Sequence, residues 1–348
     1  MRKILAVGLI CFTMAWFGNE LRGQGVHFSY LEFAPQSINP AYLGGFLGSY
    51  RGTGIYRSQY NNGTEVKGYT TFELGIDVPI IRGFRKQDWI GGGISFNVDQ
   101  RGTFAFKDTY SRLGLSYHFS LDKKQTSVLT LGLQIVNLSR TIDVPKDGTG
   151  FSIQNPTSPD PDIKKFFTSF DPDNMDRLNP KSGRDWVGGL AYTRTNKTSV
   201  LRTGIAFSGI FPVSVGFKGL FQLPFKIIGH AAMVNQINKT MSIEPAAIFQ
   251  KAGYGTEFMF NTKVGYKYNK EKNDKVKAGL GFRTGTFSAI FFMGGEIKGI
   301  NFGLSYDLPI SGYAAAPGTQ NGFEFGASYI GVLKKTPKPK PIIICPRL

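Results

Sequence analysis

Apolar and polar residues alternate one by one along most of the chain from about residue 49 onward. A period of two indicates β-strands, because successive side chains point to opposite faces of a sheet. In 257–268, one face carries Phe258, Phe260, Thr262, Val264, Tyr266 and Tyr268, and the other carries Met259, Asn261, Lys263, Gly265 and Lys267. Segments 275–283 and 300–307 alternate in the same way. The pattern therefore predicts an all-β protein.

Fifteen segments have this character, and the two on either side of Pro224 are counted as one loop-plus-strand because proline interrupts strand pairing. The predicted strands are 49–60, 67–79, 88–98, 104–118, 126–139, 184–195, 198–208, 216–235, 240–250, 255–268, 275–284, 287–295, 298–307 and 322–333. The resulting count of fourteen is even, as is usual for bacterial outer-membrane barrels.

Two architectures fit alternating strands, a soluble β-sandwich and a transmembrane β-barrel. The barrel is favoured because the strands recur with hardly any helical pattern between them, and because aromatic residues such as Tyr266 and Tyr268 gather near strand ends. A closed barrel is also the strand architecture that satisfies every backbone group inside a bilayer. We therefore predict a transmembrane barrel over residues 49–333.

The lengths of the connections predict an orientation. The long connections 140–183, 209–224 and 308–321 are the fifth, seventh and thirteenth, all odd, whereas most even connections are short and polar. Outer-membrane barrels have long extracellular loops and short periplasmic turns. If the first strand rises from the periplasm, residues 140–183 lie outside the cell and residues 269–274 lie in the periplasm.

Residues 1–23 have the three parts of a secretory signal peptide. Arg2 and Lys3 precede an apolar run over 4–17, and small residues follow over 18–23, so cleavage is predicted before Gln24. The alternative is an uncleaved anchor, but this run of 14 residues is shorter than the roughly 20 that a helical span needs. Cys345 is then the one cysteine of the mature chain, which excludes an internal disulfide.

The charge of the chain is strongly positive. The formal net charge is +17, of which the leader contributes +2, leaving about +15. An exported location argues against nucleic acid as the partner, so anionic lipid head groups or lipopolysaccharide, or an acidic protein, are the expected partners. Alternatively, many of these lysines simply solvate turns.

Three short motifs follow the leader. They are His27-Phe28-Ser29, then Asn39-Pro40-Ala41-Tyr42 with Gly44, then Tyr56-Arg57 with Gln59. In these residues the chain resembles the PorP/SprF family of Bacteroidota outer-membrane proteins, which are linked to type IX secretion and gliding motility. The resemblance implies an outer-membrane barrel that serves this secretion system. It also implies as partners a secreted surface protein with a C-terminal sorting domain, or periplasmic components of the system.

The segment 24–48 precedes the first predicted strand and is open to two interpretations. Four aromatic residues, Phe28, Tyr30, Phe33 and Tyr42, are many for a solvated arm, which favours a brace or plug in the barrel or against its periplasmic mouth. The alternative is a loose N-terminal arm. The candidate partner-binding or brace residues are Asn39, Pro40, Ala41, Tyr42, Arg57 and Gln59.

The predicted inward faces are rich in cations. The candidate basic lumen consists of Arg51, Arg202, Lys263, Lys267, Lys275 and Lys277, with Arg57 and Arg283 on the same faces. The inward acids are Glu73, Asp77, Asp307 and Glu324. Either these groups pair and line a polar lumen, as in other barrels, or the excess of cations grips an acidic segment.

The sequence contains no motif for catalysis or for a cofactor. His27, His118 and His230 lack metal-ligand spacing, and His118 is predicted to be a rim residue. We therefore expect neither a catalytic nor a metal site and no enzyme activity. Two functions remain open, a protein that assists secretion or surface anchoring of a partner, and a passive or substrate-selective porin.

The last fifteen residues, 334–348, form a tail after the final predicted strand. Prolines alternate with lysines over 337–341, which favours an extended spacer in the periplasm. An apolar group follows, Ile342, Ile343 and Ile344 beside Cys345. We predict that this group docks on a partner or on the barrel mouth; the alternative is a frayed end.

Overall fold

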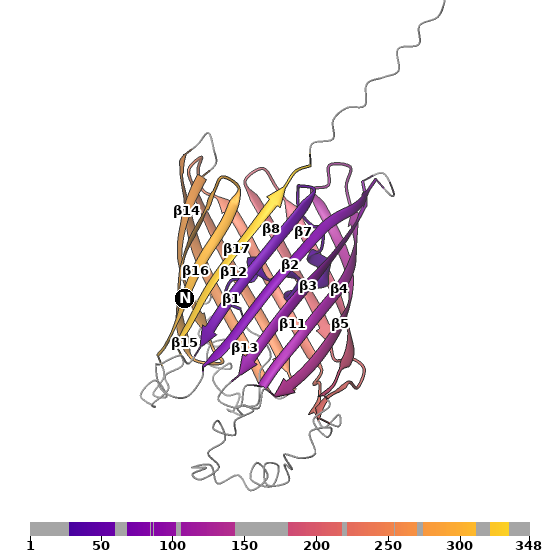
Figure 1. Ribbon diagram of the computed structural model, residues 1–348. Helices are drawn as coiled ribbons and strands as arrows, with labels where there is room; N and C mark the ends of the chain where they lie inside the picture. The colour runs from indigo at the N-terminus through magenta and orange to yellow at the C-terminus, as the bar shows by residue number, and fades with distance from the viewer. Residues whose placement is uncertain are drawn as a thin grey trace, which may run out of the picture.

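The computed structural model describes residues 28–59, 68–83, 85, 87–101, 106–142, 180–217, 221–253, 255–269, 274–310 and 321–333. Fourteen antiparallel strands in this part of the chain form a closed barrel (Figure 1). The first seven are β1 (Tyr50–Gln59), β2 (Tyr69–Arg82), β3 (Trp89–Arg101), β4 (Phe106–Ser120), β5 (Ser127–Ile142), β7 (Gly183–Thr195) and β8 (Ser199–Ser208). The others are β11 (Lys226–Gln236), β12 (Met241–Ala252), β13 (Gly255–Asn269), β14 (Asp274–Arg283), β15 (Ser288–Ile297), β16 (Ile300–Pro309) and β17 (Gly322–Gly331).

The barrel closes where β1 pairs with β17, from Tyr50 opposite Gly331 to Gln59 opposite Gly322. Every other barrel strand pairs with its sequence neighbours in the barrel, so no barrel strand is left with an open edge. The predicted all-β barrel of fourteen strands is confirmed.

The predicted strand 216–235 is divided in the structure. Its barrel part is β11, which begins at Lys226, just after Pro224. Upstream, β9 (Ser214–Phe217) and β10 (Phe221–Gln222) form a small three-stranded sheet with β6 (Pro180–Lys181) beside the barrel. Proline cannot donate to a strand ladder, which explains why the barrel strand starts beyond it.

The two ends of the barrel differ in their connections. We call the end with the start of β1 and the end of β17 the turn end, and the opposite end the loop end (Figure 1). Short connections such as 121–126, 196–198 and 298–299 join strands at the turn end. The three long connections of the sequence prediction all leave the loop end. Which side of the membrane each end faces remains a prediction.

Side-chain hydrogen bonds build the short turns. Asp122 accepts bonds from the backbone N–H groups of Lys124, Thr126 and Ser127 at 2.8–2.9 Å and from the hydroxyl of Thr126 at 2.6 Å. These bonds lower the pKa of Asp122 to about 2. Asn238 holds the turn between β11 and β12 in a similar way. Asp and Asn favour turns because they bond to backbone groups a few residues ahead.

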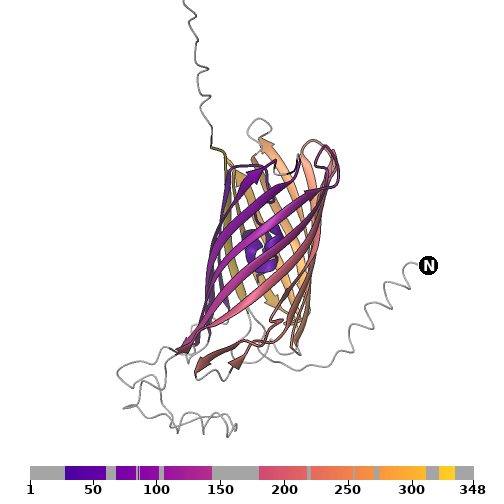
Figure 2. The same ribbon diagram turned by 90° about the vertical axis from the view of Figure 1, so that its right-hand side faces the viewer.

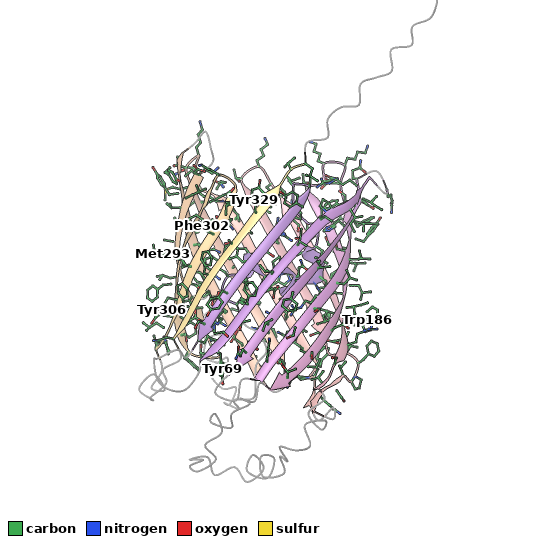
Figure 3. The ribbon with its side chains drawn as sticks, in the orientation of Figure 1. Tyr69, Trp186, Met293, Phe302, Tyr306 and Tyr329 are labelled. Carbon is green, nitrogen blue, oxygen red and sulfur yellow. The ribbon has the colours of Figure 1, made fainter. Side chains whose placement is uncertain are left out.

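The apolar faces of the strands point outward, as Figure 3 shows. Met293 is 67% exposed and Leu280 is 63% exposed, which a water-soluble sandwich would avoid. Tyr69, Trp186 and Tyr306 lie toward the loop end of this apolar surface, and Phe302 and Tyr329 lie toward the turn end (Figure 3). Aromatic residues at both borders of an apolar belt are typical of a barrel in a bilayer.

Short helical turns lie inside the barrel, where Figure 2 shows them in indigo. They are η1 (Leu31–Phe33), α2 (Pro35–Ile38) and η2 (Pro40–Tyr42). Proline at the first position of α2 and of η2 suits a helical start, because its missing N–H would have no partner there. Among the described residues, no helix has the length and apolar character to cross a bilayer.

Candidate functional site: a plugged lumen

Residues 28–48, which we call the plug, run through the lumen from the loop-end half to the turn end. Phe28, Tyr30, Phe33 and Ile38 of the plug are buried. They form one apolar cluster with inward residues of the wall, namely Ile55, Ala206, Ile228, Ile248, Met259, Ile290 and Phe292. The ring of Phe292 meets the ring of Tyr30 edge to face at 5.0 Å. An apolar core therefore occupies the place that water fills in an open porin.

Near the loop end, a buried ionic cluster binds the start of the plug. Glu324 accepts bonds from the backbone N–H of Ser29 at 2.7 and 2.9 Å and from that of Tyr30 at 3.1 Å. Arg57 forms ion pairs with Glu324 and, at 2.7 Å, with Asp307. The Ser29 hydroxyl donates to Asp307 at 3.2 Å. The cluster thus ties three barrel strands, β1, β16 and β17, to the plug.

Arg283 of β14 extends this cluster along the same side of the wall. Its guanidinium lies 3.5 Å from Asp307 and 3.3 Å from Glu257 of β13. Two arginines, Arg57 and Arg283, therefore face three carboxylates, and all five side chains are buried. Removing one member would leave an uncompensated buried charge, which is strongly destabilising.

In the middle of the lumen, Glu32 of the plug faces two lysines of the wall. Its carboxylate lies 3.3 Å from the ammonium of Lys263 and 3.9 Å from that of Lys277. Lys277 also pairs with Glu244 at 2.8 Å. Burial alone would raise the pKa of Glu32, but the two ammonium groups lower it to about 2. Glu32 is therefore ionised at neutral pH and attracts the plug to the wall.

Asn39 anchors the central turn of the plug and is fully buried. Its amide nitrogen donates two N–H groups, shared among the carbonyls of Leu190 at 3.1 Å and Ile205 at 3.2 Å and the Nε2 atom of His230 at 2.9 Å. Its oxygen accepts from the N–H of Ala41 at 2.9 Å. Because Nε2 of His230 accepts this bond, Nδ1 carries the ring proton and donates it to the Tyr42 hydroxyl at 2.8 Å.

Burial raises the pKa of Tyr42 to about 12, against the opposing effect of nearby arginines. The hydroxyl is therefore neutral at physiological pH and can donate as well as accept. The motif Asn39-Pro40-Ala41-Tyr42 thus lies inside the lumen, with Asn39 and Tyr42 bonded to the wall.

At the turn end, backbone groups of the plug bond to polar side chains of the wall. Asp77 accepts from the N–H of Gly44 at 2.7 Å and binds Arg51 at 2.8 and 2.9 Å. His118 Nε2 donates to the carbonyl of Leu43 at 2.7 Å. His118 lies near the turn end of β4, as expected of a rim residue, but its ring is buried against the plug and stacked on a tryptophan ring at 4.4 Å.

Inward glycines leave room for the plug. A Cβ at Gly93 would lie 2.7 Å from Cδ2 of Leu43, and one at Gly114 would lie 2.6 Å from its Cδ1, closer than real Cβ contacts. A Cβ at Gly132 would overlap the backbone of the central turn, and one at Gly326 would overlap the ring of Phe33. The wall is therefore shaped to this segment.

The structure brings most of the predicted site residues together and leaves a few apart. Arg202 lies 3.5 Å from the carbonyl of Gly45. Lys275 pairs with Glu296 at 3.1 Å near the turn end, and Lys267 lies beside the turn at Thr240. Gln59 ends β1 at the loop end, opposite Tyr69 and Gly322. Residues 334–348, with Ile342, Ile343, Ile344 and Cys345, and the leader 1–23 lie outside the described residues.

Several residues of the site were missed by the sequence prediction. They are Ser29, Glu32, Glu244, Glu257, His230 and the inward glycines. The glycines had a signal, since they stand on the inward faces of strands whose outward faces carry large apolar side chains. No group of three His, Cys, Asp or Glu side chains among the described residues could hold a metal ion.

These features define a class: an outer-membrane β-barrel with an apolar outer belt and a lumen occupied by its own N-terminal segment. A family model described as "Type IX secretion system membrane protein PorP/SprF" matches residues 21–329. The chain belongs to this family.

No curated protein matches the chain. Among solved structures it is similar to the toluene transporter TbuX of Ralstonia pickettii, with 14% identity, a TM-score of 0.49, and coverage of 89% of this chain and 96% of that one. The KdgM porin is similar with 9% identity, a TM-score of 0.35, and coverage of 80% and 98%.

Proposed function

We propose that this protein is a non-enzymatic barrel that assists type IX secretion by helping to export a partner protein or to hold it at the cell surface. The observation that supports this most is the plug, whose bonds to the wall run from Glu324 near the loop end to Asp77 near the turn end. A barrel sealed in this way suits a scaffold better than a diffusion pore. The family description adds the secretion system.

The proposed partners are a secreted surface protein with a C-terminal sorting domain and periplasmic components of the system. The outer belt contacts membrane lipid and lipopolysaccharide. Because the motif Asn39–Tyr42 is internal, its proposed role is to position the plug. The segment after it reaches the turn end, where Leu47 is 88% exposed and available to a partner.

Conductance in planar bilayers separates this proposal from the alternative, a passive or substrate-selective porin. The plugged barrel should be nearly silent, whereas a porin should give steady single-channel steps. Steady steps from the wild-type protein would refute the sealed scaffold.

A second experiment tests the plug itself in cells. Residues 39–42 are replaced by Gly and Ser, with the same replacement over 196–198, a turn outside the plug, as the control. The first variant should keep heat-modifiable gel migration and wild-type abundance but lose display of the partner. The control should keep display. Unchanged display in the first variant would show that the plug has no part in secretion.

The tail provides a further test. Deleting residues 334–348 should leave barrel insertion unchanged but reduce the amount of periplasmic partner recovered in a pull-down. In the proposed contact, burial of each isoleucine of the tail contributes roughly 1.5–3 kcal/mol to binding. Equal recovery of the partner from the truncated protein would contradict docking by the tail.

A further inference from the structure

A cavity of about 190 Å³ lies in the loop-end half of the lumen, between the plug and the wall. The plug contributes Ser37 and Ile38 to it, and Leu223 and Pro224 border it on the loop side. The wall side is formed by β4, β5, β7, β8, β11 and β12, which are consecutive in the barrel. The cavity is separate from the ionic cluster of Arg57 and Arg283, whose residues do not line it.

Two polar groups of this cavity lack a hydrogen-bond acceptor, and a third, the ammonium of Lys226, lacks an ion pair, among the described residues. The Nη1 atom of Arg112 and the Nε2 atom of Gln134 are buried without a hydrogen bond. The Arg112 side chain is 9% exposed and Gln134 is 1% exposed. Nη1 of Arg112 lies 3.7 Å from a carboxylate oxygen of Glu73, which is within ion-pair distance but too far for a hydrogen bond. Lys226 has no ion pair within the part of the chain that the structure describes.

Buried donors without acceptors are unusual, because losing water without gaining a hydrogen bond is unfavourable. The lining has two other charged residues, and both have hydrogen-bond partners. Arg140 is bonded to Asp108 at 2.6 and 2.7 Å, and Asp185 accepts bonds from backbone N–H groups. The donors of Arg112, Gln134 and Lys226 are therefore left for an anion.

The rest of the lining is mostly apolar. Ile38, Val136, Val187, Ala206, Phe207 and Ile228 contribute to it. An apolar cavity of about 150 Å³ in another protein holds a benzene molecule. The present cavity is large enough for a body of that size with one charged group at the cationic side.

We infer that this cavity binds a carboxylate with a small apolar body, which Arg112, Gln134 and Lys226 hold by its oxygens. The carboxylate would come either from a free organic acid or from the C-terminal residue of a polypeptide. The inference does not depend on the proposed role in secretion, because a barrel without that role would still bind such an acid.

Isothermal titration of the full-length barrel in detergent tests this site. The probes are benzoate and its neutral analogue benzyl alcohol, together with a tripeptide ending in Phe with either a free or an amidated C-terminus. Benzoate should bind at least tenfold more tightly than benzyl alcohol. Arg112→Gln and Lys226→Gln should each weaken benzoate binding by about tenfold. Lys251→Gln, an exposed lysine of β12 outside the cavity, should leave it unchanged.

Binding of the free-ended tripeptide but neither of its amide nor of benzoate would assign the carboxylate to a chain terminus. Equal binding of benzoate and benzyl alcohol would overturn the inference, as would unchanged benzoate affinity in both cavity variants. Failure of every probe would also overturn it. Heat-modifiable gel migration of each variant verifies that the barrel is folded.

Discussion

Truncation of Asn39 to alanine should loosen the plug without unfolding the barrel. The amide nitrogen of the side chain contacts the carbonyls of Leu190 and Ile205 and the ring of His230. The amide oxygen accepts a hydrogen bond from the N–H of Ala41. The two strand carbonyls keep their partners in the barrel ladder. The variant therefore leaves two buried groups, the Ala41 N–H and the His230 ring, without this partner.

Each buried group that loses its partner costs about 1–3 kcal/mol, so the plug should lose about 2–6 kcal/mol of binding free energy. Water that enters the space of the deleted amide reduces this loss, so we expect the plug to lose about 2–4 kcal/mol of binding free energy. Since about 1.4 kcal/mol is a factor of ten, the population with an undocked plug should rise by about 30-fold to about 1000-fold.

Hydrogen exchange measured by mass spectrometry reports this population directly. Peptides covering 36–44 should exchange faster by that factor in Asn39→Ala, whereas peptides from the barrel strands should not change. The control is Asn97→Ala, which removes another fully buried inward amide whose side chain donates to the carbonyl of Phe72 and not to the plug. If plug exchange changed by less than threefold in Asn39→Ala, the amide would not be an anchor.

Two further predictions follow from the same geometry, and a third follows from the lengths of the connections. Gly326→Val should displace the buried ring that occupies that space and raise conductance in planar bilayers, whereas Gly188→Val, whose Cβ meets open space, should stay silent; equal conductance would argue against steric shaping. Because the pKa of Glu32 is lowered, the stabilisation of the docked plug by its ionised carboxylate is complete above about pH 4.5 and is lost as the pH falls through about 2. The difference in open probability between wild type and Glu32→Gln should therefore narrow over that range, and a constant difference would contradict the ion pair. A membrane-impermeant thiol reagent should label Ser158→Cys but not Asn273→Cys in intact cells, and labelling only at 273 would reverse the orientation.

The barrel could be predicted from the sequence because its determinant is local. A strand places alternate residues on opposite faces, so the apolar face of 257–268 is readable without knowing any neighbour. The bilayer requires closure of the sheet, which turned fourteen such segments into a barrel. Pro224 marked the interruption near β11 for the same local reason.

The site could be predicted only in part. The inward positions of Arg57, Asp307 and Glu324 follow from the same alternation, but their partners do not. Ser29 and Glu324 are 295 residues apart in the chain, and their bond depends on the path of the plug through the lumen. No local pattern encodes that path, because the plug has neither a strand nor a helical period.

The sequence by itself therefore determined the strands, their two faces and the family motif, since each depends on residues close together in the chain. The tertiary structure alone decided that Glu32 meets Lys263, that Asn39 meets His230, and that a glycine such as Gly326 makes space for an aromatic ring. These contacts arise because closure of the barrel brings distant strands around one segment, and packing in a filled lumen is specific to the shapes that meet there.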